Sequence, residues 1–467
     1  MKTSLWVLCS ALFCGTLCAD VEEVLVDMSA GDQTVNVGEG QTKRLVITSP
    51  GVDYSITKTG AGTLCLTNNN FSASYSNLVV QGGLARVDAE NNFGAGAVTL
   101  SGGGGVAIAS DITLARAKIT FAPAGRGTVY VQEGVTFTVI EKYFITANSD
   151  VVKQGPGTIF TKGSFRTAAS SANGTWIADE GTWKIDSYQF FTPGTGDAVT
   201  KTIAVHEGAL FNASYTSASG YKNAFGNIVL RGGMFYWGNS NTVGSDVTAE
   251  ATSYGVIYLN GVVTALPSSD GSPSVMRGKN LTLSQLVNKT SDGTVFDVQD
   301  GATLEIDGSF GDDDTYPGTL KKTGAGTLRI LKTMRNTGRF NHLAGIVSLA
   351  PGVAFEEAMT LSVADGAVFR LEDRAVLEAA ANGGDALIAS ANVWFDATKV
   401  TASNIRAVPN LGRDGRAFRF KDSFMRMYGY QASVPTLLPN AINGNQVVVL
   451  SKTGYYFDYV NTTNEMT

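Results

Sequence analysis

The chain has 467 residues, of which only 16% are charged, and its formal net charge is −6. This mild acidic balance has no concentrated basic footprint, which argues against a nucleic-acid-binding protein and against binding to anionic lipid. Glycine is abundant at 54 residues and proline is scarce at 11. Such a composition favours many short strands joined by tight turns over long helices, so we expect an all-β protein.

The N-terminus has the composition of a signal peptide. Lys2 supplies a positive charge, and residues 5–17 form an uncharged, mostly apolar run that ends just before the small residue Ala19. This run is too short to span a bilayer, so export followed by cleavage is the better interpretation. We predict that residues 1–19 are removed, that the mature chain has no membrane span, and that the protein is secreted or displayed at the cell surface.

Cleavage after Ala19 removes three of the four cysteines, namely Cys9, Cys14 and Cys18. Cys65 is then alone, so we expect no intramolecular disulfide in the mature chain. Its position within a strand-like segment predicts a small packed or outward-facing residue.

One phrase occurs three times in the chain. Its copies lie at 56–66 (ITKTGAGTLCL), 152–160 (VKQGPGTIF) and 320–330 (LKKTGAGTLRI). Each copy is followed by a second phrase in which glycine leads into a strand, at 82–87, 180–185 and 344–349. A repeat of this size is one supersecondary unit that buries its apolar face only by stacking on further copies. The repeats predict a right-handed parallel β-helix, a solenoid, over residues 20–390.

A shorter phrase lies between the long ones, at 131–137, 205–211, 298–304 and 363–369. In each, an Asp-Gly or Glu-Gly pair separates two strand-like stretches, and glycine supplies the positive φ that a corner requires. On either side, alternating apolar residues are expected to point inward, and Thr, Lys, Glu and Arg to point outward. We therefore expect Leu64, Ile159 and Leu328 in the interior, and the glycines at 60, 155 and 324 at equivalent corners.

The phrase Lys58–Leu64, with the glycine phrase that follows it, resembles the autotransporter-associated β-strand repeat. The resemblance is strongest at 56–87 and 320–349, and weaker at 152–185. It implies an exported bacterial surface protein with a parallel β-helix and a structural or adhesive role. The resemblance brings no catalytic residue with it. For such a surface protein we expect surface glycans or host matrix polymers as partners.

The last segment, 391–467, differs from the repeats. Four stretches in order, Val393–Ala397, Val408–Arg416, Pro435–Gly444 and Val447–Leu450, resemble the opening of a laminin-G-like, concanavalin-type jelly-roll. Two interpretations are open: a truncated jelly-roll or a small β cap.

The main alternative to a structural role is a carbohydrate-active β-helix enzyme or a carbohydrate-binding module, because parallel β-helices also host polysaccharide lyases and glycosidases. Those reactions need carboxylates that converge on one face. Here the acids sit singly beside corner glycines, as Glu133, Glu207, Asp300 and Asp365 do. The run Asp312–Asp314 is the best calcium candidate, but a solvated loop is favoured.

Other candidate residues have simple structural interpretations. The only histidines, His206 and His342, lie outside any nucleophile motif and are expected at the surface or at corners. The aromatic clusters 235–237 and 455–459 would stack on sugars if exposed, but core packing is favoured. We predict no catalytic, cofactor-binding or metal-binding residues, and no cofactor.

Overall fold

The computed structural model describes residues 21–66, 74–140, 144–145, 149–162, 174–186, 202–213, 223–237, 257–259, 261–282, 294–311, 319–332, 334–335, 339–351, 353 and 360–372, together with five short strands between 407 and 459. The predicted signal peptide, the Asp312–Asp314 run and the boundary near residue 390 lie outside these residues.

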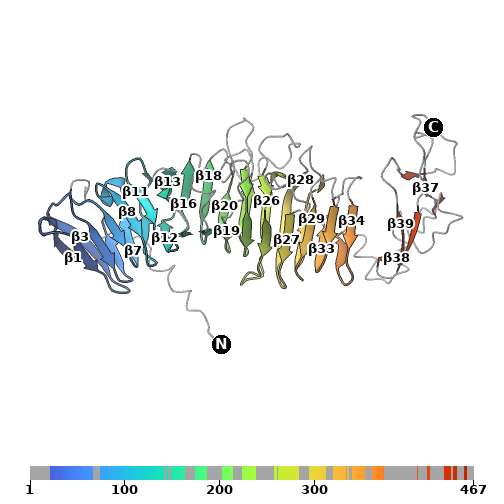
Figure 1. Cartoon of the computed structure of the whole chain (residues 1–467), viewed down its shortest axis with the longest axis horizontal. Coiled ribbons are helices and arrows are strands. Elements are labelled where there is room, and N and C mark those ends of the chain that lie inside the picture. The colour runs from blue at the N-terminus through green and yellow to red at the C-terminus, as the bar shows by residue number, and fades with distance from the viewer. Residues whose placement is uncertain are drawn as a thin grey trace.

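Parallel strands stacked in successive coils make up the solenoid, which is drawn out along one axis (Figure 1). Within the described residues its long sheet has 15 strands, and each pairs in parallel with strands one coil away. In spatial order they are β1 (Glu22–Asp27), β3 (Thr42–Ser49), β5 (Thr63–Cys65), β7 (Leu84–Val87), β9 (Gly105–Ile108), β12 (Arg126–Val131), β15 (Asp150–Gln154), β17 (Thr175–Ala178), β19 (Thr202–Val205), β22 (Asn227–Leu230), β25 (Val262–Ala265), β27 (Thr294–Val298), β29 (Leu320–Thr323), β32 (Arg339–His342) and β34 (Thr360–Val363).

Two further sheets form the other sides of the coils. The second sheet contains β10 (Ile112–Thr113), β13 (Thr136–Ile140), β16 (Thr158–Lys162), β18 (Thr182–Asp186), β20 (Leu210–Asn212), β23 (Met234–Trp237), β26 (Ser274–Thr282), β28 (Thr303–Gly311), β30 (Thr327–Ile330), β33 (Ile346–Leu349) and β35 (Val368–Leu371), with β21 (Asn223–Phe225), β24 (Ile257–Leu259) and β31 (Met334–Arg335) beside this path. The short sheet contains β2 (Gln33–Asn36), β4 (Ile56–Thr59), β6 (Leu78–Val80), β8 (Ala97–Leu100), β11 (Lys118–Phe121) and β14 (Phe144–Ile145).

The cross-section of the coil changes along the chain. Up to β9 the chain alternates between the short and long sheets, and from β9 to β15 each coil visits all three sheets. After β15 the coils are built mainly from the long and second sheets. Two 3-10 helices interrupt the strands in the first coils, η2 (Met28–Ala30) and η3 (Glu90–Phe93).

Strand register sets the size of a coil. Leu64 of β5 pairs with Ala85 of β7, and Ala85 pairs with Val106 of β9. Each of these steps is 21 residues long. Farther on the coils are larger, since Leu230 of β22 pairs with Ala265 of β25.

Inward side chains stack from coil to coil and form one continuous core. In the second sheet the buried column in register runs through Phe137, Ile159, Trp183, Phe211 and Phe235. The rings of Phe211 and Phe235 are stacked, with centroids 5.6 Å apart. Across the interior, Trp176 of the long sheet stacks on Trp183 at 4.6 Å. Stacked apolar rings bury a large area and hold neighbouring coils in register.

The corner prediction for the long phrase is confirmed in its local geometry. Gly60, Gly155 and Gly324 have φ of 76°, 77° and 74°. In each copy the glycine two residues later donates its N–H to a valine carbonyl of the preceding coil, at 2.9 Å, 3.0 Å and 2.9 Å. Leu64, Ile159 and Leu328, expected in the interior, are fully buried.

The prediction that the three glycines occupy equivalent corners is wrong for the first copy, because the three corners do not all join the same pair of sheets. The first copy lies between β4 of the short sheet and β5 of the long sheet, whereas the other two lead from the long sheet into the second sheet. The phrase therefore specifies a local bend, because its glycine geometry and its carbonyl contacts are the same at both kinds of corner.

The C-terminal strands pair differently from the coils. β36 (Ala407–Val408), β37 (Phe418–Phe420) and β40 (Phe457–Tyr459) form one antiparallel sheet, and β38 (Thr436–Ile442) pairs antiparallel with β39 (Asn445–Val449). Antiparallel pairing suits both a jelly-roll fragment and a small cap, so the two interpretations of this segment stay predictions. The prediction of an all-β parallel solenoid with a small C-terminal β segment is confirmed.

Candidate functional site

Three lysines lie inside the coils and correct the expectation that lysine points outward. Lys58, Lys153 and Lys322 are fully buried, although a rule that places charged residues on the outer face of each strand predicts the opposite. Each occupies the same place in the long phrase, two residues before the corner glycine. The signal was present in the sequence, because these lysines are in phase with the inward apolar residues of their strands.

Each buried amine is bound by backbone carbonyls of two successive coils. Lys58 Nζ donates to the carbonyl of its own corner, Gly60, at 2.5 Å, and to that of Gly82 in the next coil at 2.6 Å. Lys153 Nζ donates to the carbonyls of Gly155 and, at 2.7 Å, Glu180. We call each such set a lysine clamp.

The third clamp has one more acceptor. Lys322 Nζ donates to the carbonyls of Thr323 at 2.8 Å, Gly324 at 2.7 Å and Ala344 at 3.0 Å. Three acceptors match the three N–H groups of an ammonium, whereas a neutral amine has two N–H groups to donate.

The second glycine phrase of each repeat is the other half of the clamp. The carbonyl acceptors in the next coil directly precede Gly83, Gly181 and Gly345, whose φ values are 56°, 60° and 70°. A Cβ at Gly181 would lie 2.4 Å from Lys153 Nζ. Glycine is therefore needed there both for the turn and for the space that the amine occupies.

Burial shifts the acid–base properties of the clamps. Burial lowers the pKa of Lys58 to about 8 and that of Lys153 to about 7, where the charges of Glu180 and Asp179 act in the opposite direction. It lowers the pKa of Lys322 to about 8, against the charge of Asp297. The clamps thus keep an ionisable group inside the coil by hydrogen bonding to carbonyl dipoles.

His342 extends the third clamp by one coil. It pairs in register with Lys322, is fully buried, and its Nε2 lies 3.1 Å from the carbonyl oxygen of Gly345. This contact makes Nε2 the donor and leaves Nδ1 without a hydrogen-bond partner among the described residues. Burial, aided by the nearby charge of Lys322, lowers the pKa of His342. His342, expected at the surface or at a corner, is the last residue of β32 and lies inside the coil.

The other histidine belongs to a polar row on the outside of the long sheet. Asp179 Oδ1 lies 2.6 Å from Nδ1 of His206, and Gln154 Nε2 donates to Asp179 Oδ2 at 3.0 Å. The hydrogen bond with His206 lowers the pKa of Asp179. A carboxylate at Nδ1 fixes the orientation of the ring and leaves Nε2 as its other polar atom. No local pattern in the sequence indicates this pair, because the two residues are brought together only by coiling.

A second outward network lies on the second sheet. Arg329 donates to both carboxylate oxygens of Glu372, at 2.8–2.9 Å, and to Glu305 at 2.7 Å, and Ser348 donates to Glu372 at 2.6 Å. The hydrogen bond from Arg329 lowers the pKa of Glu372. A general acid needs a carboxyl with a raised pKa, whereas that of Glu372 is lowered. The network is therefore better suited to joining coils than to donating a proton.

The acids expected at corners are found there. Glu133, Asp300 and Asp365 are exposed, and each precedes a glycine with φ between 73° and 78°. Glu207 binds the N–H and hydroxyl of Ser269, the latter at 2.6 Å. Other carboxylates act between coils, as where Asp150 accepts the N–H of Thr175 at 2.7 Å.

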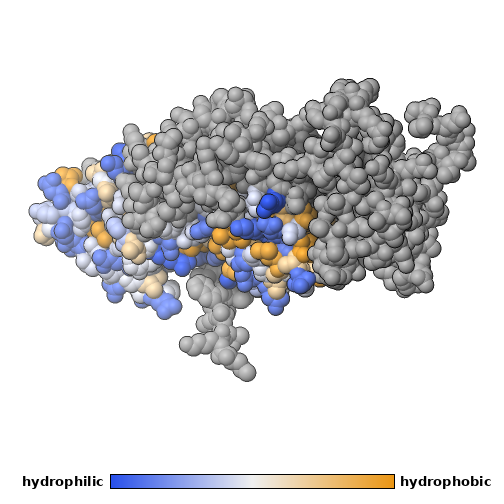
Figure 2. All heavy atoms as spheres, turned by 45° about the vertical axis from the view of Figure 1, so that its right-hand side comes forward, coloured by the Kyte–Doolittle hydropathy of each residue, from blue (hydrophilic) through white to orange (hydrophobic). Residues whose placement is uncertain are grey.

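The first aromatic cluster is core, as favoured: Phe235, Tyr236 and Trp237 are fully buried. Tyr455 and Tyr456 lie outside the described residues. The described residues visible in Figure 2 form a mosaic of hydrophilic and hydrophobic side chains. Among the described residues, the exposed large apolar side chains lie in the first coils (Leu25, Val52, Tyr54) and the last (Leu343, Leu361, Val368), where stacking is least complete.

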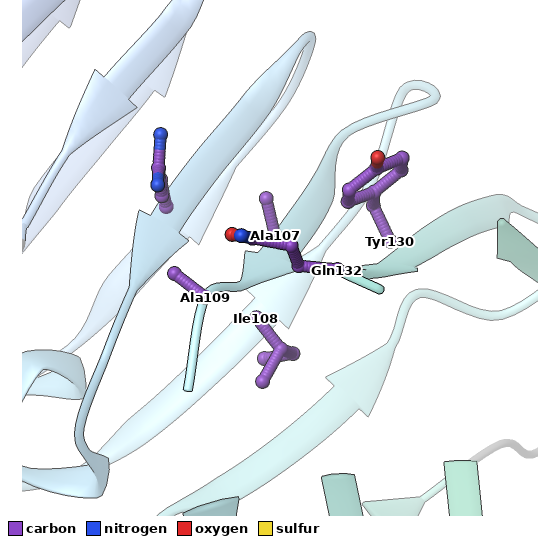
Figure 3. A pocket seen from close by; sticks show the side chains of 6 residues that line it. Ala107, Ile108, Ala109, Tyr130 and Gln132 are labelled. Atoms are coloured by element: carbon purple, nitrogen blue, oxygen red, sulfur yellow. The ribbon is translucent and has the colours of Figure 1, made fainter. Parts of the chain in front are cut away.

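A small notch opens on the outside of the long sheet (Figure 3). Its lining comes from three successive strands and consists of Arg86, Ala107, Ile108, Ala109, Tyr130 and Gln132. Its volume of about 10 Å³ is far below the roughly 300–1,000 Å³ of an ordinary small-molecule pocket. The notch can therefore receive only the edge of a ligand.

Cys65 is disulfide-bonded in the full chain, and its partner lies outside the described residues. The expectation of a lone cysteine thus applies only to a chain that has lost residues 1–19. In the part of the chain that the structure describes, no three His, Cys, Asp or Glu side chains are placed to hold a metal ion. Across the same residues, no helix has the length and apolar character that a membrane crossing requires.

Comparisons with protein-family models, with curated proteins and with solved structures found no match to this chain.

Proposed function

We propose that the protein is an exported bacterial surface element with a structural or adhesive role and without catalysis. The observation that carries the proposal is the lysine clamp, which ties successive coils together at three separate corners. A core continuous from coil to coil and clamped corners together make a stiff rod, which suits a protein that holds a binding surface away from a cell.

The use of the outward polar groups supports the same proposal. Arg329 joins carboxylates of different coils, and Asp150 holds the backbone of its neighbouring coil. These groups stabilise the solenoid through their hydrogen bonds. The N-terminal signal-like segment and the resemblance to exported repeat proteins supply the argument for a surface location.

Surface labelling of intact cells tests this proposal. An antibody raised against residues 20–372 should label unpermeabilised cells of the source organism, and externally added protease should remove the label. A periplasmic or cytoplasmic marker should stay protected in the same cells. Labelling that appears only after permeabilisation would contradict a surface role.

The alternative is a carbohydrate-active enzyme, and the Asp179–His206 pair is the observation that favours it, because a carboxylate-oriented imidazole is a general base in many enzymes. We expect no turnover of polygalacturonate or alginate, with or without calcium. Turnover abolished by His206→Ala, or by substitution of Asp312, Asp313 or Asp314, would favour the enzyme instead.

A further inference from the structure

The third lysine clamp differs from the other two in the residue that lies in register with its lysine, one coil on. In the first two clamps this residue is apolar, Val80 in one and Ala178 in the other. In the third clamp His342 pairs with Lys322 instead. All three of these partner side chains are fully buried. The repeat thus accepts an apolar residue at this inward position, and the histidine places a titratable group in the core of the last coils.

The surroundings of His342 satisfy only one nitrogen of its ring. Nε2 lies 3.1 Å from the carbonyl oxygen of Gly345, and Nδ1 is buried without a hydrogen-bond partner among the described residues. In the neutral ring Nδ1 is an unused acceptor, whereas in the protonated ring both nitrogens are donors. Protonation therefore adds to the core a charge and a donor that has no acceptor, and both are costly there.

The charged groups around His342 add to this cost. β29 places Lys322 in register with His342, while Lys321 beside it lies on the outer face. β34 contributes no titratable side chain, and Asp365 in the corner that follows it is exposed. On β32 itself Arg339 is exposed at the other end of the strand. Across the core, β30 and β33 present apolar side chains inward. A protonated His342 would therefore lie next to the positive charge of Lys322.

The acid–base properties of the ring agree with this geometry. Burial lowers the pKa of His342, the hydrogen bond to the Gly345 carbonyl acts in the opposite direction, and the charge of Lys322 lowers it further. A histidine in an unfolded chain has a pKa of about 6.5. As the pH falls through this range, the unfolded coils bind a proton more readily than the folded ones do. The free energy that holds these coils folded is therefore complete above this pH and decreases below it.

We propose that His342 makes the last described coils, which contain β32 to β35, an acid-sensitive element that opens before the rest of the solenoid. Each repeat contacts only its neighbours, so coils at one end can open while the others stay folded. Among the described residues β34 and β35 have no further parallel strand beside them, and the exposed side chains of Leu343, Leu361 and Val368 lie in these coils. At mildly acidic pH the rigid part of the rod becomes shorter at this end. The device goes beyond the proposed function and does not depend on it.

Hydrogen exchange of the purified full chain, followed by mass spectrometry at about pH 7 and about pH 5.5, tests this device. Protection factors correct for the intrinsic pH dependence of exchange. They should fall severalfold in β32 and β34 at the lower pH and stay nearly constant in β12 and β13. Carboxyl groups ordinarily titrate at about pH 4, below this window, and the hydrogen bond from Arg329 lowers the pKa of Glu372 further.

Two variants of His342 identify the titrating group. His342→Val installs the residue type of the first clamp, and His342→Gln keeps an amide donor for the Gly345 carbonyl, so the test remains if one of them fails to fold. Both should abolish the fall in β32 and β34. His206→Gln is the control and should retain it, because His206 lies on the outer face beside Asp179. Unchanged protection in the unmodified protein, an equal fall in β12 and β13, or a fall that both His342 variants retain overturns the proposal.

Discussion

The buried amine of Lys58 donates a hydrogen bond of 2.6 Å to the carbonyl oxygen of Gly82, which belongs to the next coil of the solenoid. The same relationship joins Lys153 to Glu180 and Lys322 to Ala344. Strand pairing and apolar packing join every pair of coils, but the clamps add a charge-assisted contact at selected corners. The stability of the two coils that each clamp joins is therefore coupled.

Removing a clamp should destabilise the solenoid. Lys322→Met keeps an apolar stem of similar length and deprives three partly buried carbonyls of their donor, so we expect the free energy of unfolding to fall by about 1–3 kcal/mol. Chemical denaturation measures this change. Lys321→Met is the control, since Lys321 is next in the same strand and its half-buried side chain points to the other face. Equal losses in the two variants would show that the clamp has no special role.

The clamps also predict a pH dependence. Burial lowers the pKa of Lys153 to about 7 and that of Lys58 and Lys322 to about 8, below the 10.5 of an unfolded lysine. Above pH 7 the unfolded chain therefore binds more protons than the folded one, and the free energy of unfolding should rise with pH. The rise should continue toward pH 10.5, the ordinary pKa of a lysine, and ionisation of Tyr75 in the unfolded chain should reduce its slope above about pH 9.5, because burial raises the pKa of this phenol in the folded state.

Denaturation midpoints at pH 7, 8.5 and 9.5 measure this slope, within the window set by the lysines. Lys153→Met should flatten it, because one of the three titrating groups is lost. A slope unchanged by this substitution would refute the assignment of the pH dependence to the clamps.

Two corner glycines should respond differently to the same substitution. Gly134 has φ 73° and open space where a Cβ would lie, so Gly134→Ala should cost about 1 kcal/mol through backbone strain alone. Gly155 has φ 77°, but a Cβ there would lie 2.4 Å from the carbonyl oxygen of Val131. Gly155→Ala should therefore cost on the order of 3 kcal/mol or more. Thermal unfolding of the two variants compares these costs, and equal costs would contradict the close approach at Gly155.

The C-terminal strands should be less protected than the coils. β38 and β39 form a two-stranded antiparallel sheet, and isolated hairpins are marginally stable. Hydrogen exchange should therefore be faster in β38 and β39 than in β15 and β16 of the clamped coils. Equal protection would identify residues 391–467 as an integrated cap and reject the truncated jelly-roll.

Much of the fold follows from local patterns in the sequence. Gly60, Gly155 and Gly324 mark corners because a positive φ is a property of the glycine itself, and Leu64, Ile159 and Leu328 follow from strand alternation. The inward lysines were missed because a rule based on polarity places every lysine outside, although the strand alternation places these three inside. Their partners are carbonyls one coil away, and the distance along the chain to these partners varies with the loop between.

The candidate site was harder to predict for the same reason. Arg86, Ala107 and Tyr130 form a notch only because the coils align them, and the Asp179–His206 pair also depends on that alignment. Nothing about each residue in its own strand separates it from other outward residues. Register between coils was the missing information.

The sheet change at the first corner phrase has a consequence for how such a chain can be lengthened. Since the same phrase joins the short and long sheets at Gly60 and the long and second sheets at Gly324, its bend does not depend on the side of the coil where it occurs. A gene encoding this chain can therefore gain or lose one repeat by duplication or deletion while the remaining corners keep their geometry. The length of the rod can change by single coils without redesign of its ends.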